Sequence, residues 1–202
     1  MKHRGQIGSV IVVVPVMVLS LGIVAALGCS GLFGRGTNEG RAPDETPSAT
    51  ESSPQDVSVC DAPELVWRTG RKTNYTSYPE PGSEECIVYS GCKYEGLFAA
   101  CSGKKPVGWV KSRNIAAFFP DFGSVRLHDL CIRAGNKTMV VTIYDTCGDG
   151  DCNGCCSRNR GRADALIDLE SYTNARFGVA DGPIRWADLG PTRSGGCGGP
   201  AR

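Results

Sequence analysis

The chain has 202 residues, which suits one domain with appendages, and its formal net charge of +1 gives it no electrostatic reason to bind nucleic acid. It contains 11 cysteines, a number typical of proteins that fold outside the reducing cytoplasm. We therefore exclude nucleic acid as a partner and expect an exported protein.

The N-terminal segment has the layout of an export signal. A basic start is followed by a nearly unbroken apolar run from Val10 to Gly28. The letters "AALGCS" place small residues before Cys29, as in a bacterial lipoprotein signal. Three outcomes remain open, namely lipidation of Cys29, an uncleaved membrane anchor and plain secretion. We assign residues 1–28 to a signal peptide or membrane anchor, so the protein is expected to be membrane-attached or secreted.

The next segment contains almost no apolar side chains between Gly36 and Val57. Pro, Ser, Thr, Gly and acidic residues dominate it, which is the composition of a disordered spacer. We therefore assign residues 29–58 to a linker, residues 59–192 to one folded domain and residues 193–202 to a C-terminal tail.

The cysteines divide into Cys29 in the leader region and ten others. An even number in an exported domain predicts five disulfides, whose constraint on the unfolded chain would stabilise a domain rich in turns. The sequence leaves their pairing open. The ten cysteines are Cys60, Cys86, Cys92, Cys101, Cys131, Cys147, Cys152, Cys155, Cys156 and Cys197.

The first part of the domain is rich in turn residues. The segments at residues 78–85 and 101–108 are loop-like by composition. The segment Arg113 to Phe119, "RNIAAFF", is interpreted as a single helical turn.

Regular structure is clearest in the second half of the domain. Polar and apolar residues alternate from Val125 to Ile132, the pattern breaks at Ala134 to Lys137, and a β-branched run follows from Thr138 to Ile143, which predicts a β-hairpin. The segment "DLESYTNARFG" after it has helical spacing and ends in glycine, and Gly182 to Gly190 predicts a last strand. These elements predict a disulfide-rich β domain, a small barrel.

The stretch Tyr144 to Cys156, "YDTCGDGDCNGCC", allows a calcium loop, a zinc knuckle or a carboxylate site held by disulfides. The calcium pattern begins at Asp149, but its twelfth position, which needs a glutamate, is Arg160. Zinc binding would compete with oxidation of the cysteines to disulfides, and oxidation is favoured in an exported protein. We therefore expect no metal and no cofactor, and we expect the adjacent Cys155 and Cys156 to join the loop to two different places. Asp149 and Asp151 are interpreted as solvated loop acids.

Two acids flank this Cys-rich excursion. Asp145 ends a predicted strand, and Asp168 begins the next ordered segment. If the excursion closes on itself, the two carboxyl groups meet at one end of the barrel, where they should titrate as a pair with one pKa raised. The alternative is structural, because an aspartate at a strand end often caps a turn and Asp168 could cap the helix after it.

The order of these motifs resembles the double-psi β-barrel domain of expansins and expansin-like proteins. The resemblance spans roughly Leu65 to Leu189. It implies a mainly β, disulfide-rich fold, a six-stranded double-psi β-barrel with one or two short helices. The same barrel occurs in family 45 endoglucanases, rare lipoprotein A, barwin and loosenins, so the fold is implied more strongly than the activity. The motifs are "TNYTSY", "GLFAAC", "NIAAFF", "LHDLCIRAGNKTMVVTIYDTC", "ALIDLESYTNARFG" and "GPIRWADLG".

The resemblance also implies roles for particular residues. Asp168 matches the aspartate of the expansin "H-F-D-L" motif, at the general-acid position of the related endoglucanases, and Asp145 matches the second expansin aspartate. Asn74 and Tyr75 match the opening strand of the sugar-facing groove, with Thr73 as the alternative register. Two further aromatic residues could stack on sugar rings or belong to the core: Tyr144 and Trp186.

The departures from the family decide between activities. Inverting glycosidases need an acid and a base. The resemblance implies that the base would lie in the first strand, as in the related endoglucanases, but that strand here, "KTNYTSY", contains neither Asp nor Glu. We therefore expect an exported, monomeric protein that binds and loosens cell-wall polysaccharide, peptidoglycan or β-glucan, without net hydrolysis. One alternative is a lytic glycosidase or transglycosylase with a base from Glu84, Glu85 or Glu95. Another is a barwin-like, non-catalytic binding module.

Overall fold

The computed structural model describes residues 57–193 and 196–198. The assignments made above for residues 1–56, including the export signal, the possible lipidation of Cys29 and most of the linker, lie outside the described residues. Within the described part, no helix combines the length and apolar character needed to cross a membrane.

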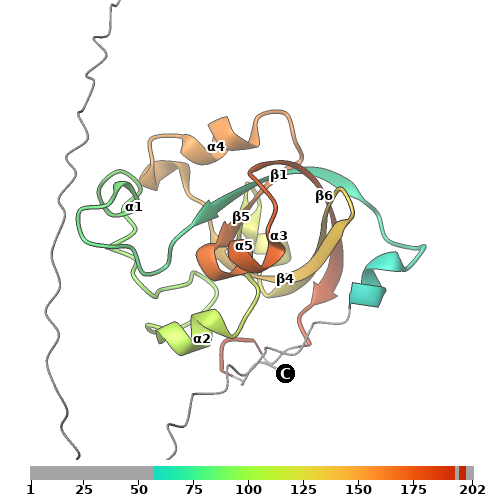
Figure 1. Cartoon of the computed structure of the whole chain (residues 1–202), viewed down its shortest axis with the longest axis horizontal. Helices are drawn as coiled ribbons and strands as arrows, with labels where there is room; N and C mark the ends of the chain where they lie inside the picture. Colours follow the sequence, from blue (N-terminus) through green and yellow to red (C-terminus); the bar gives the residue numbers. More distant parts are fainter. Residues whose placement is uncertain (1–56, 194–195, 199–202) are drawn as a thin grey trace, which may run out of the picture. The chain divides into compact units, whose positions relative to one another are not determined.

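Six strands close into a barrel in the order β1-β5-β2-β4-β3-β6 (Figure 1). Two neighbouring pairs are parallel, β1 with β5 and β2 with β4, and the other four are antiparallel. This confirms the predicted six-stranded double-psi barrel. The strands are β1 (Arg68–Tyr75), β2 (Ile115–Phe119), β3 (His128–Ala134), β4 (Lys137–Thr146), β5 (Ala165–Glu170) and β6 (Gly182–Pro191).

The helical elements are all short, and most lie in the segments that connect the strands. The predicted helix is α5, which Glu170 caps by accepting a hydrogen bond from the Tyr172 N–H at 2.7 Å, and which ends where Gly178 turns left-handed at φ 60°. The other helices are single turns that composition did not reveal. The helical elements are η1 (Val57–Asp61), α1 (Glu84–Ile87), α2 (Val107–Lys111), α3 (Phe122–Val125), η2 (Asp149–Asp151), α4 (Cys155–Arg160) and α5 (Ser171–Phe177).

The predicted hairpin corresponds to β3 and β4, and the predicted last strand to β6, so both are confirmed. The helical turn expected over Arg113 to Phe119 is wrong, because Ile115–Phe119 forms strand β2. This strand lies between β4 and β5, and its first four residues are buried. Backbone pairing on both sides and burial of both faces outweigh the helical preference of its two alanines.

Alternate residues of each strand fill the interior of the barrel, and the residues between them form its outer face. Ala116, Ile143, Ile167 and Leu169 belong to the main apolar cluster inside the barrel. Leu166 belongs to another cluster, formed with the cysteines of the Cys-rich excursion. Strand β5 is therefore covered on both faces, which explains why its sequence "ALIDLE" shows little alternation of polar and apolar residues.

All ten cysteines beyond Cys29 form disulfides, which confirms the predicted five. Cys155 and Cys156 bond to Cys152 and Cys147, respectively, both within the excursion. The expectation that they tie the loop to two different places is therefore wrong, because the excursion folds back on itself. The pairs are Cys60–Cys131, Cys86–Cys92, Cys101–Cys197, Cys147–Cys156 and Cys152–Cys155.

Candidate functional site

Four side chains form a row across four neighbouring strands. Ala117 in β2 pairs with Asp145 in β4 on one side and with Asp168 in β5 on the other. Asp168 in turn pairs with Thr73 in β1. Because directly paired residues project from the same face of a sheet, these four side chains share one face. With strands about 4.8 Å apart, the two aspartate Cα atoms lie about 10 Å from each other, separated by a small alanine.

An irregularity in β4 places Asp145 in this row. Ala116 pairs with Ile143, but Ala117 pairs with Asp145, so Tyr144 is skipped. A bulge of this kind re-aims the side chains that follow it, and bulges are frequent beside functional sites. Without the shift, Tyr144 would stand opposite Ala117 and the second carboxyl group would leave the row.

The two acids do come together, but not in the way expected from the sequence. Asp168 lies on the outer wall of the barrel, because Ile167 and Leu169 on either side of it fill the interior. Asp145 shares this outer face, because both aspartates pair with Ala117. The prediction that the two carboxyl groups meet at one end of the barrel is therefore wrong. It failed because β2 was not recognised as the strand that separates β4 from β5.

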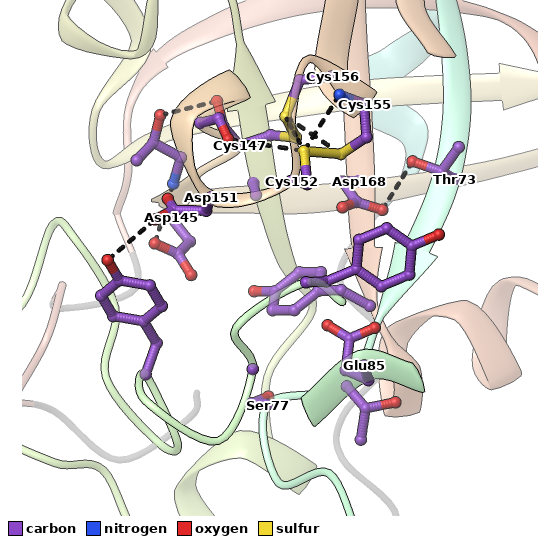
Figure 2. Close-up of a pocket in the computed structure, with 18 of the residues that line it drawn as sticks. Thr73, Ser77, Glu85, Asp145, Cys147, Asp151, Cys152, Cys155, Cys156 and Asp168 are labelled. Atoms are coloured by element: carbon purple, nitrogen blue, oxygen red, sulfur yellow. Dashed lines mark hydrogen bonds between the residues drawn. A yellow bond between two sulfur atoms is a disulfide. The ribbon is translucent and has the colours of Figure 1, made fainter. Parts of the chain in front are cut away.

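The row forms the floor of a cavity of about 740 Å³. One wall is the Cys-rich excursion, residues 147–156, and the other comes from the loop between β1 and β2, which carries α1. In Figure 2 the bonded cysteines lie on one side of the pocket, and Ser77 and Glu85 on the other. Both walls are closed by disulfides, so the cavity is shaped by covalently constrained loops.

Asp168 has the most strongly perturbed carboxyl group of the site. Burial raises its pKa to about 7, with smaller contributions from the negative charges of Glu85, Asp181 and Asp145. The Thr73 hydroxyl donates to Asp168 Oδ1 at 2.7 Å, which favours the ionised form but does not offset the burial. At mildly acidic pH, Asp168 is therefore a neutral acid facing an open cavity, as a proton or hydrogen-bond donor requires.

Asp145 has a different environment. Burial raises its pKa to about 6. The backbone N–H groups of Ala99 and Thr146 donate to its Oδ1 at 3.0 and 2.9 Å and oppose this rise. These two bonds fix the carboxyl group and tie the loop that carries Ala99 to the barrel. The sequence suggested mutual repulsion as the cause of a raised pKa, whereas burial is the main cause at both aspartates.

A third carboxyl group, Glu85, lines the same cavity. Burial raises its pKa, and a hydrogen bond from the Thr76 backbone opposes the rise. The bases predicted as possible from the sequence were Glu84, Glu85 and Glu95, with no choice among them. Glu85 alone of these three is a lining residue of the cavity, while Glu95 forms an exposed ion pair with Lys104 at 2.9 Å.

The residues expected to line the groove from β1 do so: Thr73, Asn74 and Tyr75 all face the cavity. The Asn74 amide donates to Asp181 Oδ1 at 3.2 Å. The Tyr75 hydroxyl is buried without a hydrogen-bond partner among the described residues. Burial, followed by the nearby charges of Asp145 and Asp168, raises the Tyr75 pKa well above its usual value, so this hydroxyl stays protonated.

Tyr144 and Trp186 are not groove residues. They are 1% and 2% exposed, so neither ring offers a face to a sugar, and of the two alternatives left open the structure shows the core role. Tyr144 packs edge-on against Trp109 outside the barrel, and Trp186 packs against Phe118 inside it. Strand alternation could not distinguish these positions, because a loop can bury the outer face as completely as the barrel buries the inner one.

Replacing Trp186 with Phe tests this placement. The substitution removes part of a buried ring and its hydrogen bond to the Thr69 carbonyl at 3.1 Å. We expect it to lower the free energy of unfolding by about 1 to 3 kcal/mol, measured by urea denaturation. Binding of ligands in the cavity should be unchanged. A variant that keeps its stability but loses binding would show that Trp186 is a groove residue.

The acidic and cysteine residues of the excursion were also considered as metal ligands. Two groups bring such atoms within 4.8 Å of one another, but each depends on cysteines that are bonded in disulfides, and therefore offers no thiolate. Asp149 instead accepts hydrogen bonds from Ser157, which lower its pKa. Asp151, expected to be a solvated loop acid, lines the cavity and accepts a hydrogen bond from the Tyr94 hydroxyl at 3.0 Å.

The fold and the site together define a disulfide-rich, six-stranded double-psi barrel with an acidic groove on its outer wall. No protein-family model matches the chain, and no curated protein matches it. Among solved structures, the apo expansin of Clavibacter michiganensis is similar, with 18% identity over 61% of this chain and 50% of that chain and a TM-score of 0.36. The Streptomyces papain inhibitor shares 19% identity over 61% of this chain and 94% of that chain, with a TM-score of 0.35. The chain thus matches half the length of that expansin.

Proposed function

We propose that the protein is exported and binds cell-wall polysaccharide in the groove, loosening it without net hydrolysis. The observation that carries the proposal is Asp168, an acid with a pKa of about 7 on the floor of an open cavity. As a neutral acid it donates a hydrogen bond to a glycan oxygen and competes with the bonds that hold neighbouring chains together. Asp145, fixed by two backbone N–H groups, is the companion acid of the same row.

The acidic lining of the groove favours binding of a polysaccharide without acidic groups. Besides Asp145 and Asp168, the described lining includes Glu85, Asp151 and Asp181, and none of its described residues is Lys, Arg or His. Lys72 lies behind the lining and neutralises Asp181 at 2.7 Å, but the other acids have no such partner among the ion pairs of the described residues. Where these acids are ionised, a chain bearing carboxylates or phosphates would meet repulsion, whereas a neutral or amino-bearing chain would not.

Replacing Asp168 with Asn is expected to reduce weakening of the polysaccharide at pH 5.5 about 10-fold, the factor that corresponds to about 1.4 kcal/mol of lost hydrogen bonding. The amide keeps the shape of the side chain but is a weaker hydrogen-bond donor than a carboxylic acid. Creep of loaded polysaccharide strips measures the effect, and the wild-type activity should fall as the pH rises through about 7. Asp121→Asn is the matched control, since Asp121 is an exposed acid outside the groove lining. Equal creep in wild type and Asp168→Asn would refute this role.

One observation favours a second function, lytic cleavage of peptidoglycan or β-glucan. Glu85 enters the groove from the loop wall and interacts electrostatically with Asp168, so it is placed to supply the base that β1 lacks. Assays of reducing ends or muropeptides released from purified substrate separate the two functions. Release that is lost in Glu85→Gln and kept in Glu64→Gln, an exposed control, would favour cleavage. A folded protein that binds no glycan would instead be a binding module of another kind.

A further inference from the structure

The loop wall of the groove is unusually apolar for an exposed segment. Five of the nine large apolar side chains that are exposed in the described domain lie within residues 84–97. A cluster of this kind on a small exported domain marks a binding surface more often than chance exposure does. The five are Ile87, Val88, Tyr89, Tyr94 and Leu97, which are 71%, 53%, 38%, 38% and 42% exposed.

Only some of these side chains face the groove. Tyr89, Tyr94 and Leu97 line the cavity, whereas Ile87 and Val88 do not. The two tyrosines are therefore half-exposed aromatic rings on the rim of a cavity whose floor consists of hydrogen-bonding acids. A sugar ring has the matching chemistry, with polar edges that bond to acids and an apolar C–H face that packs on an aromatic ring.

The loop is held in shape before any ligand binds. The Cys86–Cys92 disulfide closes it, and the Gly91 N–H donates to the Glu85 carbonyl at 2.8 Å. A Cβ at position 91 would lie 2.9 Å from that carbonyl oxygen, so only glycine permits the close turn. Hydrogen bonds from the Tyr94 and Leu97 N–H groups, at 3.2 and 2.8 Å, continue the folded path. The rings are thus presented with little freedom to lose on binding.

Contacts across the groove fix Tyr94 further. Its hydroxyl donates to Asp151 Oδ1 at 3.0 Å, and the Ser90 hydroxyl donates to the Asp151 carbonyl at 3.4 Å, so the loop is tied to the Cys-rich wall. The Lys93 ammonium lies 4.7 Å from the centre of the Tyr94 ring. That contact is exposed and weak, and a sugar ring can displace it.

We infer that Tyr89 and Tyr94 form the sugar-stacking wall of the groove and supply most of its affinity for an uncharged or amino-bearing polysaccharide chain. This inference rests on the proposed function, because it names the residues that hold the same ligand in the same cavity. It also gives the groove aromatic contacts in place of Tyr144 and Trp186, which the fold buries.

Calorimetric titration of the full chain with cellohexaose and with the hexamer of N-acetylglucosamine tests the inference. Tyr89→Leu and Tyr94→Leu are each expected to raise the Kd of the oligosaccharide that binds about 10-fold. Tyr89→Phe and Tyr94→Phe keep the ring and should stay within about 3-fold of the wild type. Ile87→Ser is the matched control, because Ile87 is more exposed and on the same loop but outside the cavity lining.

Each outcome has a distinct meaning. Wild-type affinity in both Leu variants, or equal losses in the Phe and Leu variants, overturns the stacking role while the proposed function stands. An equal loss in Ile87→Ser also overturns it, since binding would then be adsorption to an apolar patch. If the wild type binds neither oligosaccharide nor insoluble polysaccharide, the proposed function fails and the inference fails with it. Melting temperatures of all variants exclude unfolding as the cause of any loss.

Discussion

Asp168→Asn is expected to stabilise the domain by about 2 to 4 kcal/mol at pH 8 and to leave its stability unchanged near pH 3. Burial raises the pKa of Asp168 from 3.8 to about 7 in the folded protein. Between these two values the folded state binds more protons than the unfolded state, so the free energy of unfolding falls as the pH rises. Above about pH 7 the folded protein carries the cost of a partly buried carboxylate, which an amide avoids. Urea unfolding at several pH values measures the difference.

Asp164, whose pKa is lowered rather than raised in the folded protein, provides the control. Asp164 accepts hydrogen bonds from the Thr69 N–H and hydroxyl at 2.9 and 2.7 Å, and these bonds lower its pKa. A lowered pKa in the folded state contributes stability above the unfolded pKa and loses it as the pH falls, so Asp164→Asn should destabilise the protein at neutral pH. If Asp168→Asn shows no gain at pH 8, Asp168 is not buried as a charged group and its proposed role as a neutral acid loses its basis.

Replacing both Cys60 and Cys131 with Ala is expected to lower the free energy of unfolding by about 4 kcal/mol. This disulfide spans 71 residues and ties η1 to β3. Closing a loop of that length removes much of the unfolded chain's freedom, which is the main source of a disulfide's stabilisation. Alanine avoids placing a hydroxyl in the apolar cluster that contains both cysteines. Urea unfolding of the double variant measures the loss.

The Cys86–Cys92 disulfide gives the comparison, since it closes a loop of only 6 residues. Its removal by a double alanine variant should cost about 2 kcal/mol at most. Because it shapes the loop that carries Tyr89, we expect this variant to lose oligosaccharide binding more readily than overall stability. The Cys60 and Cys131 double variant should show the reverse, with binding retained wherever the protein remains folded. Equal stability losses in the two variants would argue against the loop-length explanation.

The candidate site could be predicted in part. Asp145 and Asp168 stood out because they flank the Cys-rich excursion and match a family motif, and the structure places both in one row. One raised pKa was expected from the closeness of the two acids, but that burial raises the pKa of both could not be predicted, because burial depends on loops that are distant in sequence. Glu85 was one of three equivalent candidates, and Asp151 was dismissed, since nothing local shows which loop acid faces a cavity.

The sequence by itself determined the local elements of the barrel. The hairpin of β3 and β4, the helix α5 with its final glycine and the strand β6 follow from periodicity and turn residues, which act over a few positions. The even number of cysteines likewise predicted five disulfides. Only the tertiary structure decided that β2 is a strand, how the cysteines pair and where Asp145 and Asp168 meet. These features arise from contacts between segments far apart in the chain, where pairing, burial and loop closure outweigh local preference.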